Sequence, residues 1–61
     1  MDSFSMFCML TRLENAIQGL EIALIAAEKQ NRQDEFWNGR VREWKAIIAE
    51  CLDGLNKAID N

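Results

Sequence analysis

The chain has no histidine, no tyrosine and no proline, and only two of its 61 residues are cysteine. Without histidine, the commonest general base and a frequent metal ligand are missing. Nucleophilic catalysis by Cys8 or Cys51 would need such a base beside the thiol. We therefore expect a protein that is not an enzyme and that holds neither a metal ion nor another cofactor. The two cysteines are expected to be free thiols in a reducing compartment, although a Cys8–Cys51 bridge is geometrically conceivable.

Basic charge and long apolar runs are also scarce. Ten acidic residues against seven basic ones give a net charge of -3, so a whole-protein basic footprint for nucleic acid is absent. No apolar run approaches the roughly 18 residues of a membrane helix. Residues 1–10 lack the basic region and the cleavage site of a signal peptide. The sequence therefore predicts a cytoplasmic protein with no membrane partner.

Apolar residues are abundant, at 49% of the chain, and they recur in a regular 4-3 rhythm in each half. The first stripe is Met6, Leu10, Leu13, Ile17, Leu20, Leu24 and Ala27, and the second is Trp37, Val41, Trp44, Ile48, Cys51, Leu55 and Ala58. A period of about 3.5 residues is typical of a helix that packs along one seam. The two stripes differ in phase, and the residues between them, 30–34, are wholly polar.

These patterns predict a helix over residues 5–30, a loop over 31–33 and a second helix over 34–59. Asn31 or Asp34 could cap the second helix by accepting hydrogen bonds from its free N–H groups. Two helices of equal length joined by a short loop form an antiparallel hairpin, so the fold class is all-α with one domain over 1–61. Two alternatives are a separate arm over residues 1–10 before a capping box at Thr11, and a turn at Asn38-Gly39.

Self-association is expected because a chain this small buries only about 60% of its unfolded surface. Disulfides or a metal ion often stabilise such small folds, and neither is predicted here. A homodimer, in the form of a four-helix bundle, or a larger helical oligomer would supply the missing buried surface. In length and layout the chain resembles the small dimeric hairpin proteins that bind RNA loops to control plasmid copy number. The resemblance lies in size and heptad pattern, and no residue is assigned a role from it.

Heptad positions predict which flank of the hairpin forms the oligomer interface. If Leu10 is at position a and Leu13 at position d, the g positions of the two helices face each other. These positions are mostly apolar and small, and the expected interface residues are Met9, Ala16, Ala23, Ile47 and Gly54. The opposite flank, at the e positions, is polar near the loop, where Glu21 could meet Lys45, and apolar near the termini.

Two further groups of residues are candidate binding surfaces. Apolar side chains opposite the seam predict a site for a partner protein, and they are Ile22, Ile25, Phe4 and Phe7. The two tryptophans fit a core position, but their edges could also reach a basic face that binds an anion or a partner. That face would comprise Trp37, Arg40, Arg42, Trp44 and Lys45, within a segment, 29–45, that has five basic and three acidic residues.

Other motifs favour structural explanations. Glutamates repeat every seven residues at Glu14, Glu21 and Glu28, but helical di-metal sites also need histidine, so solvated charge is the simpler interpretation. Gly19 and Gly39 lie inside the predicted helices on outer faces. Each costs about 1 kcal/mol relative to alanine, unless the backbone must be accessible there to a ligand or partner. Gly39 is the better candidate for such access.

The leading functional hypothesis is a non-catalytic protein-interaction module. Tiny acidic one-domain chains without catalytic groups are often inhibitors or adaptors that bind a larger protein, including phage proteins that act on their hosts. The alternative is a binder of an anionic ligand, a nucleotide or RNA, through the Trp/Arg face of the second helix. A third possibility is a purely structural assembly element.

Overall fold

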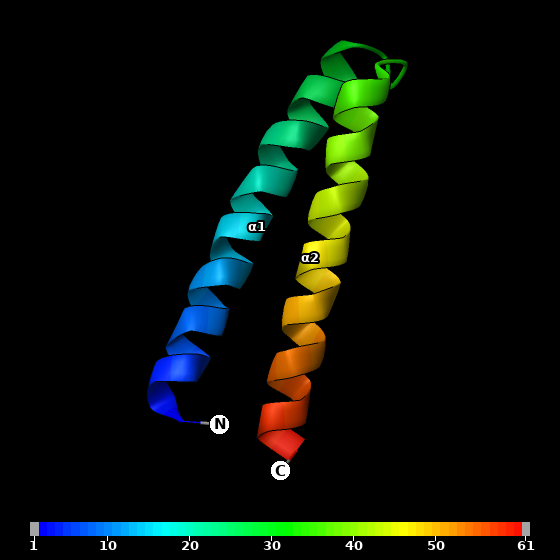
Figure 1. Cartoon of the computed structure of the whole chain (residues 1–61). Helices are drawn as coiled ribbons and strands as arrows, with labels where there is room; N and C mark the ends of the chain where they lie inside the picture. Colours follow the sequence, from blue (N-terminus) through cyan, green and yellow to red (C-terminus); the bar gives the residue numbers. More distant parts are fainter. Residues whose placement is uncertain (1, 61) are drawn as a thin grey trace.

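The computed structural model describes residues 2–60 and consists of two helices, α1 (Ser3–Lys29) and α2 (Glu35–Asp60). The helices pack against each other in opposite directions, so the start of α1 and the end of α2 lie at the end of the rod away from the turn (Figure 1). The rod measures 43 × 15 × 12 Å. The predicted all-α two-helix hairpin is confirmed, and α1 runs without a break through the region where a separate arm was considered.

Aspartates begin both helices. The carboxylate of Asp2 accepts a hydrogen bond from the backbone N–H of Ser5 at 2.7 Å, so α1 starts two residues earlier than predicted. This hydrogen bond from the Ser5 backbone stabilises the charged form of Asp2 and holds its pKa below the usual value. At α2, Asp34 rather than Asn31 is the cap, because its Oδ1 accepts from the N–H groups of Phe36 at 2.9 Å and Trp37 at 3.2 Å.

The turn between the helices depends on two residues in the left-handed conformation, Asn31 (φ 55°) and Arg32 (φ 59°). This conformation ends α1 and lets the N–H of Arg32 donate to the carbonyl of Ala27 at 2.8 Å. The side-chain amide of Asn38 then donates to the carbonyl of Arg32 at 2.8 Å. The turn is thereby held from both helices, and the Asn38-Gly39 pair lies inside α2 instead of forming a turn.

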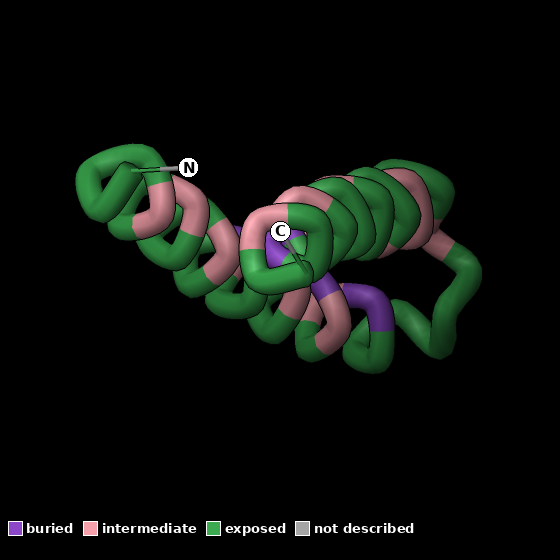
Figure 2. Tube along the Cα trace, turned by 90° about the horizontal axis from the view of Figure 1, so that it is seen from below, coloured by how far each residue is buried: buried purple, intermediate pink, exposed green. Residues whose placement is uncertain are grey.

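The core is small, and most of the Cα trace is exposed or intermediate (Figure 2). Within residues 2–60, the buried apolar residues are Ala16, Ala23, Ala27, Cys51 and Leu55. In α2 the predicted seam is correct, since all of its members are buried or half-buried. In α1 it is correct only in part. Five of its members are buried or half-buried, but Leu10 and Ile17 remain 50% exposed while Ala16 and Ala23 are fully buried.

The physical reason for this difference is side-chain size. Small residues let two helix backbones approach closely, and α1 turns its alanines toward α2 while its larger aliphatic side chains point sideways. Met9, at the same heptad position, packs its terminal methyl group against Gly54. Four of the five residues expected at an oligomer interface, Met9, Ala16, Ala23 and Gly54, therefore pack between the two helices of one chain. The assignment of Ala16 and Ala23 to a contact between subunits is corrected, since neither has any exposed surface left.

Candidate functional site

The hairpin has two flanks with different chemistry. We call a residue that packs between α1 and α2 a contact residue. Because the helices are antiparallel, the residue that follows a contact residue points to the same flank of the hairpin in both helices. The residues just before contact residues, such as Asn15 before Ala16, lie on what we term the groove flank. The residues just after them, such as Ile17 after Ala16 and Leu52 after Cys51, lie on what we term the apolar flank.

The groove flank has a groove of about 360 Å³ where α1 and α2 diverge toward the chain ends. Its lining is mostly apolar and consists of Phe7, Cys8, Thr11, Arg12, Asn15, Trp44 and Ile47. Arg12 meets Glu50 across the groove flank at 3.4 Å, and both side chains are mainly exposed. An exposed ion pair of this kind contributes little to stability and yields easily to a ligand. The groove has the size and apolar character to accept a side chain from a partner protein.

Trp44 forms the wall of this groove by lying against the backbone of Gly19. A Cβ atom on Gly19 would approach Cζ2 of the indole ring to 2.6 Å, which is closer than real contacts allow. Gly19, predicted to lie on an outer face, is therefore the residue that admits the ring. Gly39, predicted as the better site of backbone access, would place its Cβ 3.7 Å from the flexible Arg42 side chain.

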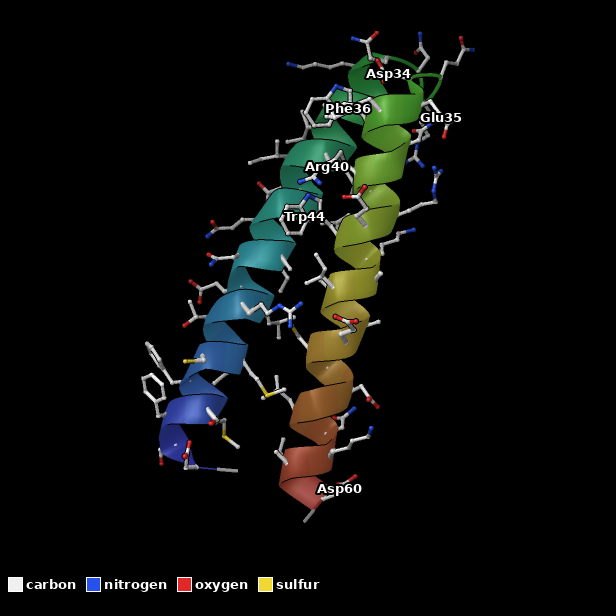
Figure 3. The ribbon with its side chains drawn as sticks, in the orientation of Figure 1. Asp34, Glu35, Phe36, Arg40, Trp44 and Asp60 are labelled. Carbon is white, nitrogen blue, oxygen red and sulfur yellow. The ribbon has the colours of Figure 1, made fainter. Side chains whose placement is uncertain are left out.

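Aromatic and cationic side chains continue along α2 from the groove toward the turn. Phe36, Arg40 and Trp44 follow one another on the side of α2 that faces the viewer in Figure 3. The guanidinium carbon of Arg40 lies 5.1 Å from the centroid of Trp44, within the range of a cation–π interaction. Phe36 stacks on Trp37 with ring centroids 4.9 Å apart.

The predicted basic face is only partly assembled. Arg40 and Trp44 are adjacent, but Lys45 follows Trp44 and so lies on the apolar flank. Both arginines have carboxylate partners, at 2.6 Å between Arg40 and Glu43 and at 3.0 Å between Arg42 and Glu35. Each arginine of this face is therefore already paired with a carboxylate of α2.

The predicted partner-binding residues form two patches rather than one. Ile22 and Ile25 are 63% and 52% exposed on α1, with Ile22 just before the buried Ala23 and Ile25 on the side away from α2. Phe4 lies 18 positions before Ile22, which at 1.5 Å per residue is about 27 Å along the helix. Phe7 lies near Phe4 and lines the groove, so it joins the outer side of α1 to the groove flank.

The remaining candidate groups are dispersed. Cys8 is exposed in the groove and Cys51 is buried between the helices, and both are free thiols. Within residues 2–60, Glu21 and Lys45 do not form the ion pair that their heptad positions suggested, and no three Cys, Asp or Glu side chains gather as a metal site. Neither α1 nor α2 has an apolar stretch long enough to cross a membrane.

Compared with known proteins, the chain matches no family model, no curated protein and no solved structure. The heptad pattern of the sequence does not predict the groove, the contact of Trp44 with Gly19 or the exposure of Leu10 and Ile17. The spacing of Gly19 and Trp44 offered one signal, since a glycine in one helix level with a tryptophan in the other indicates close packing.

Proposed function

We propose that this hairpin is a non-catalytic protein-interaction module, such as an inhibitor or adaptor, that binds a larger protein. One observation carries the proposal: within residues 2–60, nine large apolar side chains are between 47% and 74% exposed, whereas five apolar residues are buried. Scattered exposed apolar residues are ordinary, but a small protein that leaves more large apolar groups outside than inside has surfaces suited to a partner.

The groove and the adjoining Phe7 are the favoured contact with that partner. Fully desolvated pockets that receive one apolar or aromatic side chain provide much of the binding energy at protein interfaces. The charged side chain in the lining of the groove is Arg12, which is paired with Glu50. The expected partner therefore presents an apolar side chain to the groove, and the exposed pair Ile22 and Ile25 offers a second contact.

A binding experiment with matched variants tests this proposal. The wild-type chain, immobilised and exposed to an extract of the cells that make it, should retain one protein in stoichiometric amount. Phe7→Asp should abolish retention, whereas Gln18→Asp, which adds the same charge to an exposed position of α1, should not. Circular dichroism should show equal helicity in both variants. If the Phe7→Asp variant and the Ile22→Asp/Ile25→Asp double variant both retain the partner as well as the wild-type chain does, both proposed contacts are wrong.

Self-association is part of the same proposal. Three of the five buried residues are alanines and a fourth is a cysteine, so the apolar area buried within one chain is small. Ordering 61 residues costs roughly 1.5 kcal/mol each, and a core of this size does not offset that cost comfortably. Burial of exposed apolar side chains in a homodimer or larger bundle would stabilise the fold.

A second candidate is an anion-binding module for a nucleotide or RNA. The row of Phe36, Arg40 and Trp44 favours it, because an arginine between aromatic rings can support stacking of a base. The partners Glu43 and Glu35 weigh against it, since a phosphate would have to displace them. The salt dependence of binding distinguishes the two candidates. An affinity that depends on contacts with two phosphates should fall on the order of tenfold between 50 and 200 mM salt. Arg40→Glu should abolish binding of this kind.

A further inference from the structure

The apolar flank has exposed side chains that the proposed partner contact does not use. Leu10 and Ile17 of α1 are each 50% exposed, and Leu52 and Ile59 of α2 are 47% and 72% exposed. We propose that a second copy of this chain covers the apolar flank, an inference that rests on the self-association proposed above. The twofold axis of the dimer runs parallel to the helices, so that both turns lie at the same end of a four-helix bundle.

The side chains of this flank are close enough to form one patch. Gly19 lies against Trp44 and Met9 lies against Gly54, so positions whose numbers add to about 63 are level with each other. Leu52 is therefore level with position 11, beside Leu10. Patch and groove lie on opposite flanks, and a second copy on the apolar flank leaves the groove open for another protein.

Charge on this flank selects the symmetry. The residues of α1 that follow Leu13, Leu20 and Ala27 are Glu14, Glu21 and Glu28, and the corresponding charged residue of α2 is Lys45. With the twofold axis across the helices, α1 would face α1 of the second copy. The glutamate rows would then meet, and like charges at an interface are unfavourable.

With the axis parallel to the helices, α1 faces α2 of the second copy. Lys45 is level with position 18, so Lys45 of the second copy lies between Glu14 and Glu21. In the same arrangement Leu10 meets Leu52 of the second copy. Apolar groups are thus matched near the chain ends, and acidic and basic groups are matched near the middle of the flank.

The mass of the full chain in solution is the first test. Sedimentation equilibrium should give twice the 7.0 kDa chain mass at micromolar concentration. Leu10→Asp should dissociate the dimer, whereas Ile22→Asp, which adds the same charge at an exposed position of α1 away from the apolar flank, should not. Lys45→Glu should weaken association about tenfold, and Glu14→Lys/Glu21→Lys in that background should restore it.

Cross-linking tests the symmetry with substitutions that preserve folding. In a Cys8→Ser background, a chain with Leu10→Cys mixed with a chain with Leu52→Cys should give the mixed disulfide dimer on mild oxidation. A monomer at every concentration would overturn both the self-association and this inference. A dimer that survives Leu10→Asp, or that cross-links Leu10→Cys to Ile17→Cys instead, would overturn only the face and the symmetry proposed here.

Discussion

The indole ring of Trp44 occupies the space that a side chain at position 19 would fill. Gly19 has helical backbone geometry and needs no unusual φ, so its conformational freedom is not what the fold requires. What the fold requires is the missing Cβ, because the ring approaches the backbone of α1 at this point. The contact sets the distance between the helices beside the groove.

Gly19→Ala should destabilise the hairpin even though alanine is the better helix former. The added methyl group would overlap a rigid ring, and overpacking of this kind costs about 1–3 kcal/mol. Gly39→Ala is the matched control, because its Cβ would meet only the mobile Arg42 guanidinium. That variant should gain up to about 1 kcal/mol. Urea unfolding at one fixed protein concentration measures both, and equal stabilisation by the two variants would contradict the observed contact.

Ala23→Glu should unfold the hairpin rather than merely dissociate an oligomer. Ala23 is fully buried between α1 and α2, so a carboxylate there would be desolvated without a partner or would force the helices apart. A loss of about 3 kcal/mol or more is expected. Ala49→Glu, on the exposed side of α2, should change the free energy of unfolding by less than about 0.5 kcal/mol. A helical, monomeric Ala23→Glu variant in circular dichroism and sedimentation would show that the alanine face is not the internal contact.

The turn predicts a difference between two substitutions of Arg32. Arg32→Gly and Arg32→Ala both remove the ion pair with Glu28, but only glycine adopts the left-handed conformation without a steric cost. The glycine variant should be more stable than the alanine variant by about 1 kcal/mol. Thermal unfolding at matched concentration provides the comparison. Identical stabilities would mean that the turn does not hold Arg32 at a positive φ.

Acidification should loosen the first turn of α1 through Asp2. Its pKa is lowered in the folded chain, so the cap contributes its full stability above the usual aspartate value of about 3.9. That contribution is lost as the pH falls through the lower pKa of the folded state. As the pH falls from 5 to 2, hydrogen exchange of the Ser5 amide should become faster relative to the same amide in the Asp2→Asn variant. Asparagine caps helices without titrating, so parallel behaviour of the two proteins would rule out a titrating cap.

The amino-acid sequence determined the number of helices, their approximate bounds and the position of the turn. The apolar period of each half is a local property, because every turn of a helix repeats the same pattern. A polar segment with a capping aspartate likewise marks its own boundary, as Asp34 does. The seam of α2 could be predicted for the same reason, since Trp37, Cys51 and Leu55 are the bulky or apolar members of one face.

Only the tertiary structure decided which face of α1 meets α2. Two stripes compete on that helix, one with Leu10 and Ile17 and the other with Ala16 and Ala23, and hydrophobicity alone favours the larger residues. The alanines are buried because they permit the closer approach and because Gly19 admits Trp44 at the same level. This rotation places the larger side chains on the apolar flank and opens the groove on the other. The rotation of α1 depends on how the shapes of the two helices fit together, and the apolar periodicity of a single helix gives no information about that fit.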